Sequence, residues 1–477
     1  MRQIHHFING EPVASARTFD DIDPRTGEVI AQVAEAGAAE VDAAVRAARA
    51  ALGGPWGKLS TPQRAELLHA IADGITRRFD DFLAAEIADT GKPRALAAHL
   101  DIPRGAANFR VFADAVKHAA TEAFEMTTPA GRPGLNYARR RPKGVVAVVC
   151  PWNLPLLLMT WKVGPALACG NTVVVKPSEE TPASAALLGE VMTAAGVPRG
   201  VYNVVHGFGP GSAGELLTRH PGIDAITFTG ETRTGAAIMA AAAAGLKPVS
   251  MELGGKNPAV VFADADLELV IAGLRRSVFE NTGQVCLGTE RIYVERPVFD
   301  AVVERLGAVA RGVTYGDEAA SSIGPLISRD HRDKVLGYYA QARALGATIV
   351  AGGGAPDRPG WWIEPTVWTG LAHASPVVQD EIFGPCCAVL PFDREAEVVA
   401  LANDTRYGLC ASVYTRDLAR AHRVAAQLEV GVCWVNCWFV RDLRTAFGGS
   451  KQSGIGREGG VHSLEFYSEL TNVCVQL

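Results

Sequence analysis

The sequence predicts an α/β fold that consists of a doubly wound α/β domain, a second α/β domain and a small β element. Three observations support this prediction. Short β-branched apolar runs alternate with helical runs between residues 144 and 262. The same alternation returns more weakly after residue 265, and two strand-like segments fit neither set. This order favours parallel sheets covered by helices, with ligands at the carboxyl ends of the strands.

The elements of the first set follow in chain order. The N-terminal third is predicted to be mainly helical, with amphipathic runs at residues 39–52, 62–77 and 80–90. The strands of the first sheet are predicted at residues 145–149, 172–175, 202–205, 225–228 and 258–262. Helices are predicted between them at residues 156–169, 182–195, 211–219 and 233–244.

A second set of elements follows. Its strands are predicted at residues 259–262, 291–294, 347–350, 387–390, 409–414 and 432–435, with helices at 297–311, 330–344, 395–402 and 417–428. Residues 124–143 and 464–477 are predicted to be exposed strands. Because an apolar strand at a chain end is an unprotected edge, we expect a second copy of the chain to cover it, in a homodimer or homotetramer.

Composition excludes several functional classes. The 477 residues are 48% apolar, which is enough for two or three cores, and the formal net charge of −5 argues against a nucleic-acid partner. The apolar stretch at residues 145–175 is interrupted by Pro151, Lys162 and Pro165, which argues against a membrane span.

The cysteines and the N-terminus indicate a compartment. Nine cysteines, an odd number without a CxxC pair, disfavour a disulfide framework and a structural zinc site, so no metal is expected. The first ten residues lack the apolar core of a signal peptide. We therefore expect a cytoplasmic protein.

The most informative residue is Cys286, in the run Phe279-Glu-Asn-Thr-Gly-Gln-Val-Cys-Leu-Gly. Small and amide residues flank this thiol, which is expected at the start of a helix, and Glu252 offers a carboxylate from another segment. A covalent mechanism needs such a nucleophile and a separate base. Taken singly, Cys286 is equally consistent with a core thiol, and Glu252 with an ion pair to Lys256.

A glycine pattern indicates a dinucleotide. Gly230-x-Thr232-x-x-Gly235 falls at a strand-to-helix turn, where backbone N–H groups and a helix N-terminus can face a pyrophosphate. Gly209 offers a second close approach of the backbone. Either feature alone is also typical of an ordinary turn or loop.

Seven motifs, in order, resemble the series found in the NAD(P)-dependent aldehyde dehydrogenases. They are Pro151-Trp-Asn-Leu-Pro155, Lys176-Pro-Ser-Glu179, Phe228-Thr-Gly-Glu-Thr-Arg-Thr-Gly235, Glu252-Leu-Gly-Gly-Lys256, Gly283-Gln-Val-Cys286, Glu381-Ile-Phe-Gly-Pro385 and Phe447-Gly-Gly-Ser-Lys-Gln-Ser-Gly454. The resemblance implies a Rossmann-type cofactor domain (1–123 and 144–252), a catalytic domain (253–447) and oligomerisation strands (124–143 and 460–477).

The same resemblance implies the catalytic roles. Cys286 attacks an aldehyde, and the side-chain amide of Asn153 with the backbone N–H of Cys286 stabilises the oxyanion. Glu252 is the implied base for hydrolysis of the thioester. Without the resemblance, Asn153 would be interpreted as a turn residue between two prolines.

Cofactor contacts are also implied. A carboxylate at Glu179 accepts hydrogen bonds from ribose hydroxyls and repels a 2′-phosphate, which favours NAD over NADP. Glu231 departs from the small hydroxyl residue usual after Gly230, which leaves its phosphate contact open. The full implied cofactor set is Trp152, Lys176, Ser178, Glu179, Gly209, Gly230, Glu231, Gly235, Leu253, Glu381 and Phe383.

For the substrate, the segments Cys437-Trp-Phe-Val-Arg-Asp-Leu-Arg444 and Gly459-Gly-Val-His-Ser-Leu-Glu-Phe-Tyr467 most resemble the 2-aminomuconate and 2-hydroxymuconate semialdehyde dehydrogenases. Arg441 stands where many relatives have an aromatic residue, and a guanidinium suits a substrate carboxylate. Arg444 is a rival, and Arg104 is a second implied contact. The implied tunnel residues are Leu154, Leu157, Leu158 and Trp161.

Other functions remain open at this level. A broad-specificity or betaine-type aldehyde dehydrogenase would share the same motifs. A coenzyme A-acylating enzyme would resolve the thioester with a thiol, although Glu252 argues against it. A catalytically silent binding protein could keep the fold without turnover.

Overall fold

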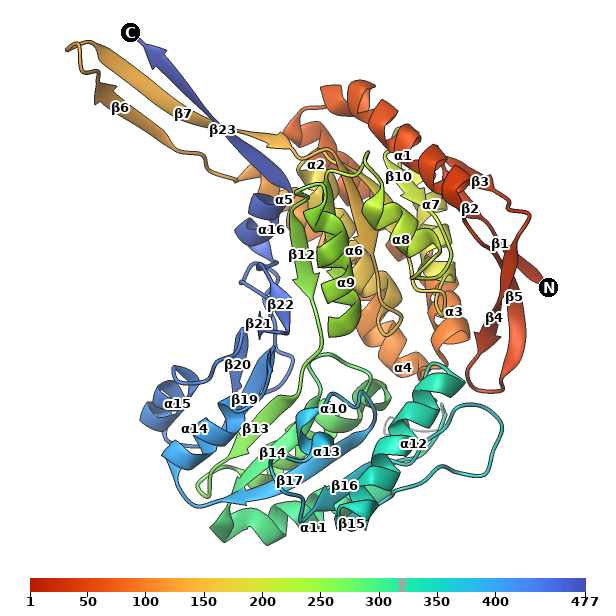
Figure 1. The fold of residues 1–477 in the computed structure, drawn as a ribbon, viewed down its shortest axis with the longest axis vertical. Coiled ribbons are helices and arrows are strands. Elements are labelled where there is room, and N and C mark those ends of the chain that lie inside the picture. The colour runs from red at the N-terminus through yellow and green to blue at the C-terminus, as the bar shows by residue number, and fades with distance from the viewer. Residues whose placement is uncertain (317–321) are drawn as a thin grey trace.

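A computed structural model describes residues 1–316 and 322–477 of the chain. Figure 1 shows two lobes, each built around a sheet, and a narrow three-stranded sheet that projects from the upper lobe. The chain passes from the upper to the lower lobe between β12 (Val249–Glu252) and β13 (Asn257–Val261). Among the described residues, every helix is too short or too polar to cross a lipid bilayer.

The first sheet forms the core of the upper lobe. Its strand order is β22-β12-β11-β8-β9-β10-β2-β3, and the pairs from β12 to β10 are parallel. These strands are β8 (Val145–Val149), β9 (Thr172–Lys176), β10 (Tyr202–Val204) and β11 (Ala225–Thr229). The chain runs outward from β8 in one direction and returns through β11 in the other, so the switch point lies between β8 and β11, as a doubly wound sheet requires.

Helices cover both faces of this sheet, because alternate residues of its strands point to opposite sides. In β8, Val146 and Val148 join one apolar cluster, whereas Val145 and Val149 join another. The first cluster includes helices α2 (Thr61–Arg77), α3 (Phe79–Thr90), α5 (Ile102–Lys117), α6 (Pro155–Ala168) and α7 (Ala183–Ala194). The second includes α1 (Ala38–Gly53), α8 (Ala213–Arg219) and α9 (Thr232–Ala243). The helices predicted in this part of the chain are confirmed.

The first 34 residues form strands, which the sequence prediction did not include. Strands β1 (Arg2–Ile4), β4 (Thr18–Asp23) and β5 (Glu28–Ala34) make a small sheet, and the hairpin β2 (His6–Ile8) and β3 (Glu11–Val13) extends the first sheet beside β10. These strands are only three to seven residues long. Such short runs give little periodic signal in a sequence.

The second sheet forms the core of the lower lobe, with the order β15-β16-β17-β14-β13-β19-β20. The prediction that residues 258–262 also belong to the first sheet is wrong: β13 pairs with β14 and β19, and β12 takes that place in the first sheet. The other strands are β14 (Thr289–Glu295), β15 (Thr348–Ala351), β16 (Thr366–Thr369), β17 (Cys386–Phe392), β19 (Cys410–Tyr414) and β20 (Val432–Val435). The helices around it are α10 (Leu267–Phe279), α11 (Phe299–Arg311), α12 (Arg329–Ala344), α13 (Pro376–Gln379), α14 (Glu395–Asn403) and α15 (Leu418–Ala425).

The projecting sheet consists of β6 (Ala123–Thr127), β7 (Pro133–Pro142) and β23 (Ser468–Gln476), in the order β23-β7-β6. It confirms the predicted exposed strands, except that residues 460–466 form helix α16 (Gly460–Phe466) against the upper lobe. Short strands β18 (Tyr407–Gly408), β21 (Ser450–Lys451) and β22 (Gly454–Ile455) link the two lobes, because β22 pairs with β12 of the first sheet.

Candidate active site

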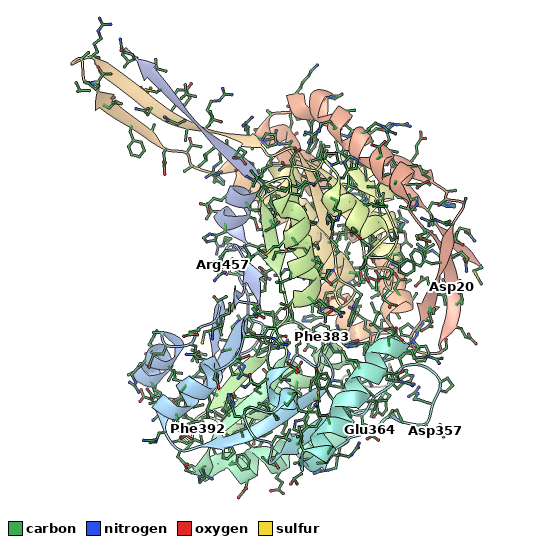
Figure 2. The ribbon with its side chains drawn as sticks, viewed as in Figure 1. Asp20, Asp357, Glu364, Phe383, Phe392 and Arg457 are labelled. Carbon is green, nitrogen blue, oxygen red and sulfur yellow. The ribbon has the colours of Figure 1, made fainter. Side chains whose placement is uncertain are left out.

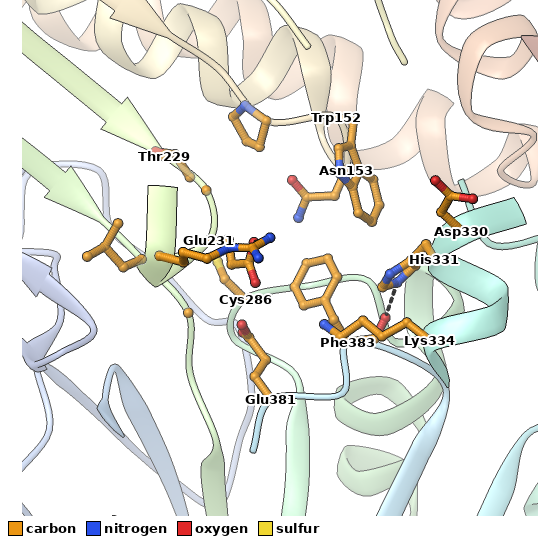
Figure 3. Close-up of a pocket in the computed structure, with 15 residues that line it drawn as sticks. Trp152, Asn153, Thr229, Glu231, Cys286, Asp330, His331, Lys334, Glu381 and Phe383 are labelled. Atoms are coloured by element: carbon orange, nitrogen blue, oxygen red, sulfur yellow. Dashed lines mark hydrogen bonds and ion pairs between the residues drawn. The ribbon is translucent and has the colours of Figure 1, made fainter. Parts of the chain in front are cut away.

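A cavity of about 330 Å³ lies where the two sheets face each other (Figure 3). Residues that follow β8 and β11, at the switch point of the first sheet, border it on one side, and residues that precede β13, β14 and β17 border it on the other. A switch point is where ligands bind in open α/β sheets. Of the residues predicted from the sequence, the cavity brings together Trp152, Asn153, Gly230, Glu231, Leu253, Cys286, Glu381 and Phe383.

Cys286 lies in a loop between α10 and β14, so the prediction that it begins a helix is wrong. The backbone before it is left-handed at three successive residues, with φ of 52° at Asn281, 58° at Thr282 and 70° at Gly283. A positive φ at a β-branched threonine is strained, and such strain persists where the surroundings determine the geometry. The hydroxyl of Thr282 donates to the carbonyl of Gly324 at 2.9 Å, which is one of the bonds that hold this turn.

The surroundings of the Cys286 thiol raise its pKa above the ordinary value. Burial raises its pKa to about 12, and the nearby carboxylates of Glu252 and Glu381 raise it further, whereas Arg441 acts in the opposite direction. A thiolate is the reactive nucleophile. The thiol must therefore lose its proton when the substrate binds.

Glu252 ends β12 and is buried behind Cys286, outside the lining of the cavity. Its Oε1 has no hydrogen-bond partner among the described residues. Burial raises the pKa of Glu252 to about 8, the carboxylate of Glu458 adds to this shift, and Lys162 and Arg441 reduce it. The alternative of an ion pair with Lys256 is not realised, because Lys256 pairs with Glu290.

Asn153 directs its side chain towards the Cys286 loop (Figure 3). Its Nδ2 donates to the backbone carbonyl of Gln284 at 3.0 Å. A side-chain amide has two N–H groups, so one of them is still available to a second acceptor. The position of Asn153 therefore suits an oxyanion donor.

The predicted pyrophosphate turn connects β11 with α9. Glu231 is the residue before the first turn of α9, but its carboxylate makes no capping hydrogen bond and lies 3.4 Å from Arg233. Gly235 packs tightly, because a Cβ there would lie 2.5 Å from Leu253 Cδ2. Without a side-chain cap, the backbone N–H groups of the first turn of α9 keep the capacity to bind an anion.

The residues predicted to hold a ribose lie at the carboxyl end of β9. Lys176 Nζ pairs with Glu179 Oε2 at 2.9 Å, and Ser178 is buried and accepts from the N–H of Glu180. Gly209 lies in the loop between β10 and α8, where a Cβ would meet open space. None of these four predicted residues lines the cavity that contains Cys286.

Aromatic rings from both lobes line the cavity. Trp152 meets Phe383 edge to face at 5.5 Å, and His331 lies 5.3 Å from Trp152. His331 Nε2 also bonds to the carbonyl of Phe383 at 2.8 Å. Figure 2 places Phe383 at the boundary between the lobes. Glu381 accepts from the N–H of Gly255 at 2.8 Å, and burial raises its pKa to about 7.

Sequence reasoning missed several residues that line the cavity, namely Arg233, Asp330, His331 and Lys334. Three of them lie in the first two turns of α12, where the run Arg329-Asp-His-Arg-Asp-Lys334 has the polarity of a solvated helix face. No local signal distinguishes such a face from a wall of a site. Only the meeting of the two sheets does so.

Two arginines converge on Trp161, which lies on α6. The guanidinium of Arg441 lies 4.3 Å from the Trp161 ring and that of Arg104, on α5, lies 6.0 Å from it. Burial lowers the pKa of Arg441 to about 9 and that of Arg104 to about 10, and for Arg441 the charge of Arg104 is a further cause. Leu154 and Leu157 are buried at the start of α6, and Leu158 is half-buried.

The two arginines differ from Arg444 in what they bind. Nε and Nη2 of Arg441 are buried and have no hydrogen-bond partner within residues 1–316 and 322–477. Arg444, in contrast, is exposed and its guanidinium is paired with the carboxylate of Asp442 at 2.6 Å. Arg441 therefore keeps buried donors that have no partner among the described residues.

Comparison with known proteins agrees with this geometry. The model of the aldehyde dehydrogenase family matches residues 12–473. The chain is 68% identical to a 2-hydroxymuconic semialdehyde dehydrogenase of Pseudomonas sp. (strain CF600), over 100% of both chains. It is 57% identical to a 2-aminomuconic 6-semialdehyde dehydrogenase of Pseudomonas sp., over 100% of this chain and 99% of that protein.

A solved structure has the same fold. The NAD⁺ complex of an aldehyde dehydrogenase from Bacillus cereus superposes with a TM-score of 0.97 at 40% identity, over 100% of this chain and 97% of that one. A match over nearly the whole length leaves no large part of this chain outside the shared architecture. The chain with Cys286 at the meeting point of its two sheets thus belongs to the aldehyde dehydrogenase family.

Proposed function

We propose that this protein oxidises a carboxylate-bearing semialdehyde to the dicarboxylate with NAD as the acceptor, the substrate being 2-hydroxymuconate or 2-aminomuconate 6-semialdehyde. One observation carries the choice of substrate. Arg441 and Arg104 converge on Trp161, and Arg441 keeps buried donors without a partner among the described residues. Buried guanidinium donors without a hydrogen-bond partner are costly, so a site of this kind favours an anionic ligand.

The cofactor site fits NAD. The backbone N–H groups at the start of α9 suit a pyrophosphate, and the carboxylate of Glu179 beside Lys176 suits ribose hydroxyls. A 2′-phosphate near Glu179 would be repelled by on the order of 4 kcal/mol for unit charges about 4 Å apart near a surface. When bound, NAD supplies the acceptor for the hydride that the substrate carbon loses.

The first step is addition. The Cys286 thiol gives its proton to water, its sulfur bonds to the aldehyde carbon as the carbonyl π bond breaks, and the carbonyl oxygen becomes an alkoxide. Nδ2 of Asn153 and the backbone N–H of Cys286 donate to this oxygen, and removing one such donor typically costs roughly 3 kcal/mol of transition-state stabilisation. Loss of hydride from the same carbon then leaves a thioester on Cys286.

The second step is hydrolysis. The carboxylate of Glu252 takes a proton from water, the hydroxide oxygen bonds to the thioester carbon, and the carbon–sulfur bond breaks to release the acid and the Cys286 thiolate. The pKa of about 8 makes Glu252 a stronger base than an ordinary carboxylate. With this pKa, a minority of the Glu252 carboxyl groups is ionised at neutral pH.

The substrate assignment is tested with Arg441→Ala. In the wild type and the variant, kcat/KM is measured for 2-hydroxymuconate 6-semialdehyde and for propanal, a neutral aldehyde. Because Arg441 also lowers the pKa of Cys286 and Glu252, both aldehydes are expected to react more slowly in the variant. Loss of a charge-assisted pair of hydrogen bonds is expected to lower kcat/KM for the semialdehyde by on the order of 10- to 100-fold more than that for propanal. Arg444→Ala is the matched control, because Arg444 is exposed and paired with Asp442. Equal losses for both aldehydes would reject the assignment.

We further propose that the protein acts in the cytoplasm as a homodimer or homotetramer. All nine cysteines are free thiols, which suits a reducing compartment. The projecting sheet of β6, β7 and β23 exposes apolar side chains, among them Phe124 and Leu470. Exposed apolar strands at a sheet edge favour pairing with another subunit.

A further inference from the structure

Lys92 is a buried cation that the catalytic steps above do not use. It follows Gly91, which ends α3 in a left-handed conformation, and only 2% of its side chain is exposed. Its ammonium pairs with Asp101 Oδ2 at 2.6 Å and lies 3.9 Å from Glu86 Oε2. Both carboxylates are fully buried. Because desolvation offsets the attraction in a buried ion pair, stability alone gives little reason for this arrangement.

The third contact of Lys92 leads to the active site. Nζ donates to the backbone carbonyl of Asn153 at 2.9 Å. The same carbonyl accepts from Asn281 Nδ2 at 3.2 Å, and Asn281 also donates to the carbonyl of Gln284. Asn153 is thus held through its carbonyl by Lys92, while its side-chain amide faces the Cys286 loop through Gln284.

The partner of Lys92 leads to the substrate arginines. Asp101 is the last residue of a π-helical turn, η2 (Ala97–Asp101), that runs directly into α5. Arg104 lies in the first turn of α5, three residues beyond Asp101. A π-helical turn contains more residues than an α-helical one and often marks a functional site. It lets Asp101 face the buried ammonium of Lys92 while Arg104 faces Trp161.

We propose that Lys92 and Asp101 are a positioning pair that holds the oxyanion donor Asn153 and the carboxylate-binding Arg104 in register, an inference that rests on the proposed function. Lys92 bonds to the residue that stabilises the oxyanion and to the segment that carries Arg104. A reacting aldehyde and its distant carboxylate need both groups at a fixed separation. A misplacement of about 1 Å at such a site can cost on the order of 100-fold in rate.

The test removes the ammonium without removing the volume. Lys92→Met is compared with the wild type by stopped-flow measurement of the NADH burst, with 2-hydroxymuconate 6-semialdehyde and with propanal. The burst rate constant is expected to fall by on the order of 10- to 100-fold for both aldehydes. KM is expected to rise for the semialdehyde alone, because only that substrate uses Arg104. Lys117→Met is the matched control, since Lys117 pairs with Asp114 at the surface of α5.

A double-mutant cycle separates positioning from a general structural effect. In an Asn153→Ala background, Lys92→Met is expected to lower the burst rate constant by less than about threefold, because the group it positions is gone. The same fold loss in both backgrounds would overturn the proposal.

A second variant removes the risk that one unpaired buried charge unfolds the protein. Glu86→Gln/Lys92→Met/Asp101→Leu removes all three buried charges of the cluster, and replacing a buried charged cluster by neutral side chains is often neutral or stabilising. Its unfolding temperature is expected to be close to that of the wild type, and its burst rate constant is expected to remain low. A wild-type burst rate constant in this variant overturns the positioning role alone. A wild-type enzyme that forms no NADH with either aldehyde overturns the proposed function and this inference together.

Discussion

Burial and the carboxylate of Glu458 both raise the pKa of Glu252. This shift predicts how the activity depends on pH. The pKa of about 8 means that the basic form is a minority at neutral pH and the majority above pH 8. If hydrolysis limits turnover, kcat rises with pH and levels off above about 8. The Cys286 thiol, with a pKa of about 12, gives no plateau in this range by itself.

Steady-state kcat measured from pH 6 to pH 10 tests this prediction. Glu252→Gln is expected to give one burst of NADH with a trapped thioester, and any remaining turnover should lack the inflection near pH 8. A wild-type profile that is flat across this range would contradict the assignment of Glu252 as base. Unchanged turnover in Glu252→Gln would mean that another group activates water.

The same shift affects stability. Folding raises the pKa of Glu252 above its ordinary value, so the folded state binds this proton more tightly than the unfolded chain does. The contribution of this group to the free energy of unfolding is therefore fully present below the unfolded pKa and is lost as the pH rises through about 8. As the proposed base, Glu252 would therefore act in the ionised form that weakens the fold.

The residues that the sequence could predict are those whose chemistry is visible in a short run. Cys286, Asn153 and Phe383 stand in motifs, and the structure brings all three to one cavity. His331 and Lys92 stand in no such run, because one lies on a polar helix start and the other in a loop. Their positions depend on contacts between segments that are far apart in the chain.

At the scale of elements, the loop before Cys286 depends on one glycine. Gly283 has a φ of 70°, and a Cβ there would lie 2.1 Å from the carbonyl oxygen of Gly384, next to the segment that carries Glu381 and Phe383. Gly283→Ala is therefore expected to lower the free energy of unfolding by roughly 1–3 kcal/mol and to abolish most activity. Urea unfolding and kcat check the two effects.

Gly337→Ala is the control for that variant. Gly337 lies inside α12, and a Cβ there meets no atom within 4 Å. Alanine is favoured over glycine in a helix by about 0.5–1 kcal/mol, so this variant should gain stability and keep its activity. If Gly283→Ala behaved like Gly337→Ala, the loop would not depend on the left-handed turn.

The elements also show where sequence prediction fails. Residues 258–262 are as apolar and β-branched as the strands of the first sheet, so their composition does not tell which sheet they join. The structure shows that the chain crosses between the sheets just before them. At Gly254, a Cβ would lie 2.3 Å from Glu381 Oε2, so the crossing chain passes directly against the second lobe. This contact is long-range, and a local pattern cannot report it.

At the scale of the whole molecule, the two lobes have complementary roles that neither sheet could fulfil alone. The switch point of the first sheet provides Asn153 and the start of α9, and the second lobe provides Cys286, Glu381 and Phe383. The short pairing of β22 with β12 ties the lobes together beside Glu252. The Cys286 thiol and the proposed dinucleotide site belong to different lobes. We therefore expect the reacting carbon of the substrate to lie between the two lobes.

The projecting sheet has no such role within one chain, and its exposed apolar side chains predict an oligomer. Phe124 is 63% exposed on β6 and Leu470 is 55% exposed on β23, the two outer strands of that sheet. Burying large apolar side chains contributes about 1.5–3 kcal/mol each, so replacing both should weaken subunit association strongly. In sedimentation equilibrium, we expect the wild type to have a mass that is a multiple of 50.4 kDa. We expect the variant Phe124→Ser/Leu470→Ser to have the mass of one chain, 50.4 kDa.

Leu345→Ser is the control for this experiment, because Leu345 is 48% exposed and follows α12 in the lower lobe, whereas the projecting sheet extends from the upper lobe (Figure 1). Removing an apolar side chain outside the projecting sheet should leave the mass of the assembly unchanged. The residues that line the cavity beside Cys286 come from the one chain described, so we expect the monomeric variant still to show the NADH burst. A wild type that sediments at 50.4 kDa, or a double variant that keeps the wild-type mass, would mean that the projecting sheet does not join subunits.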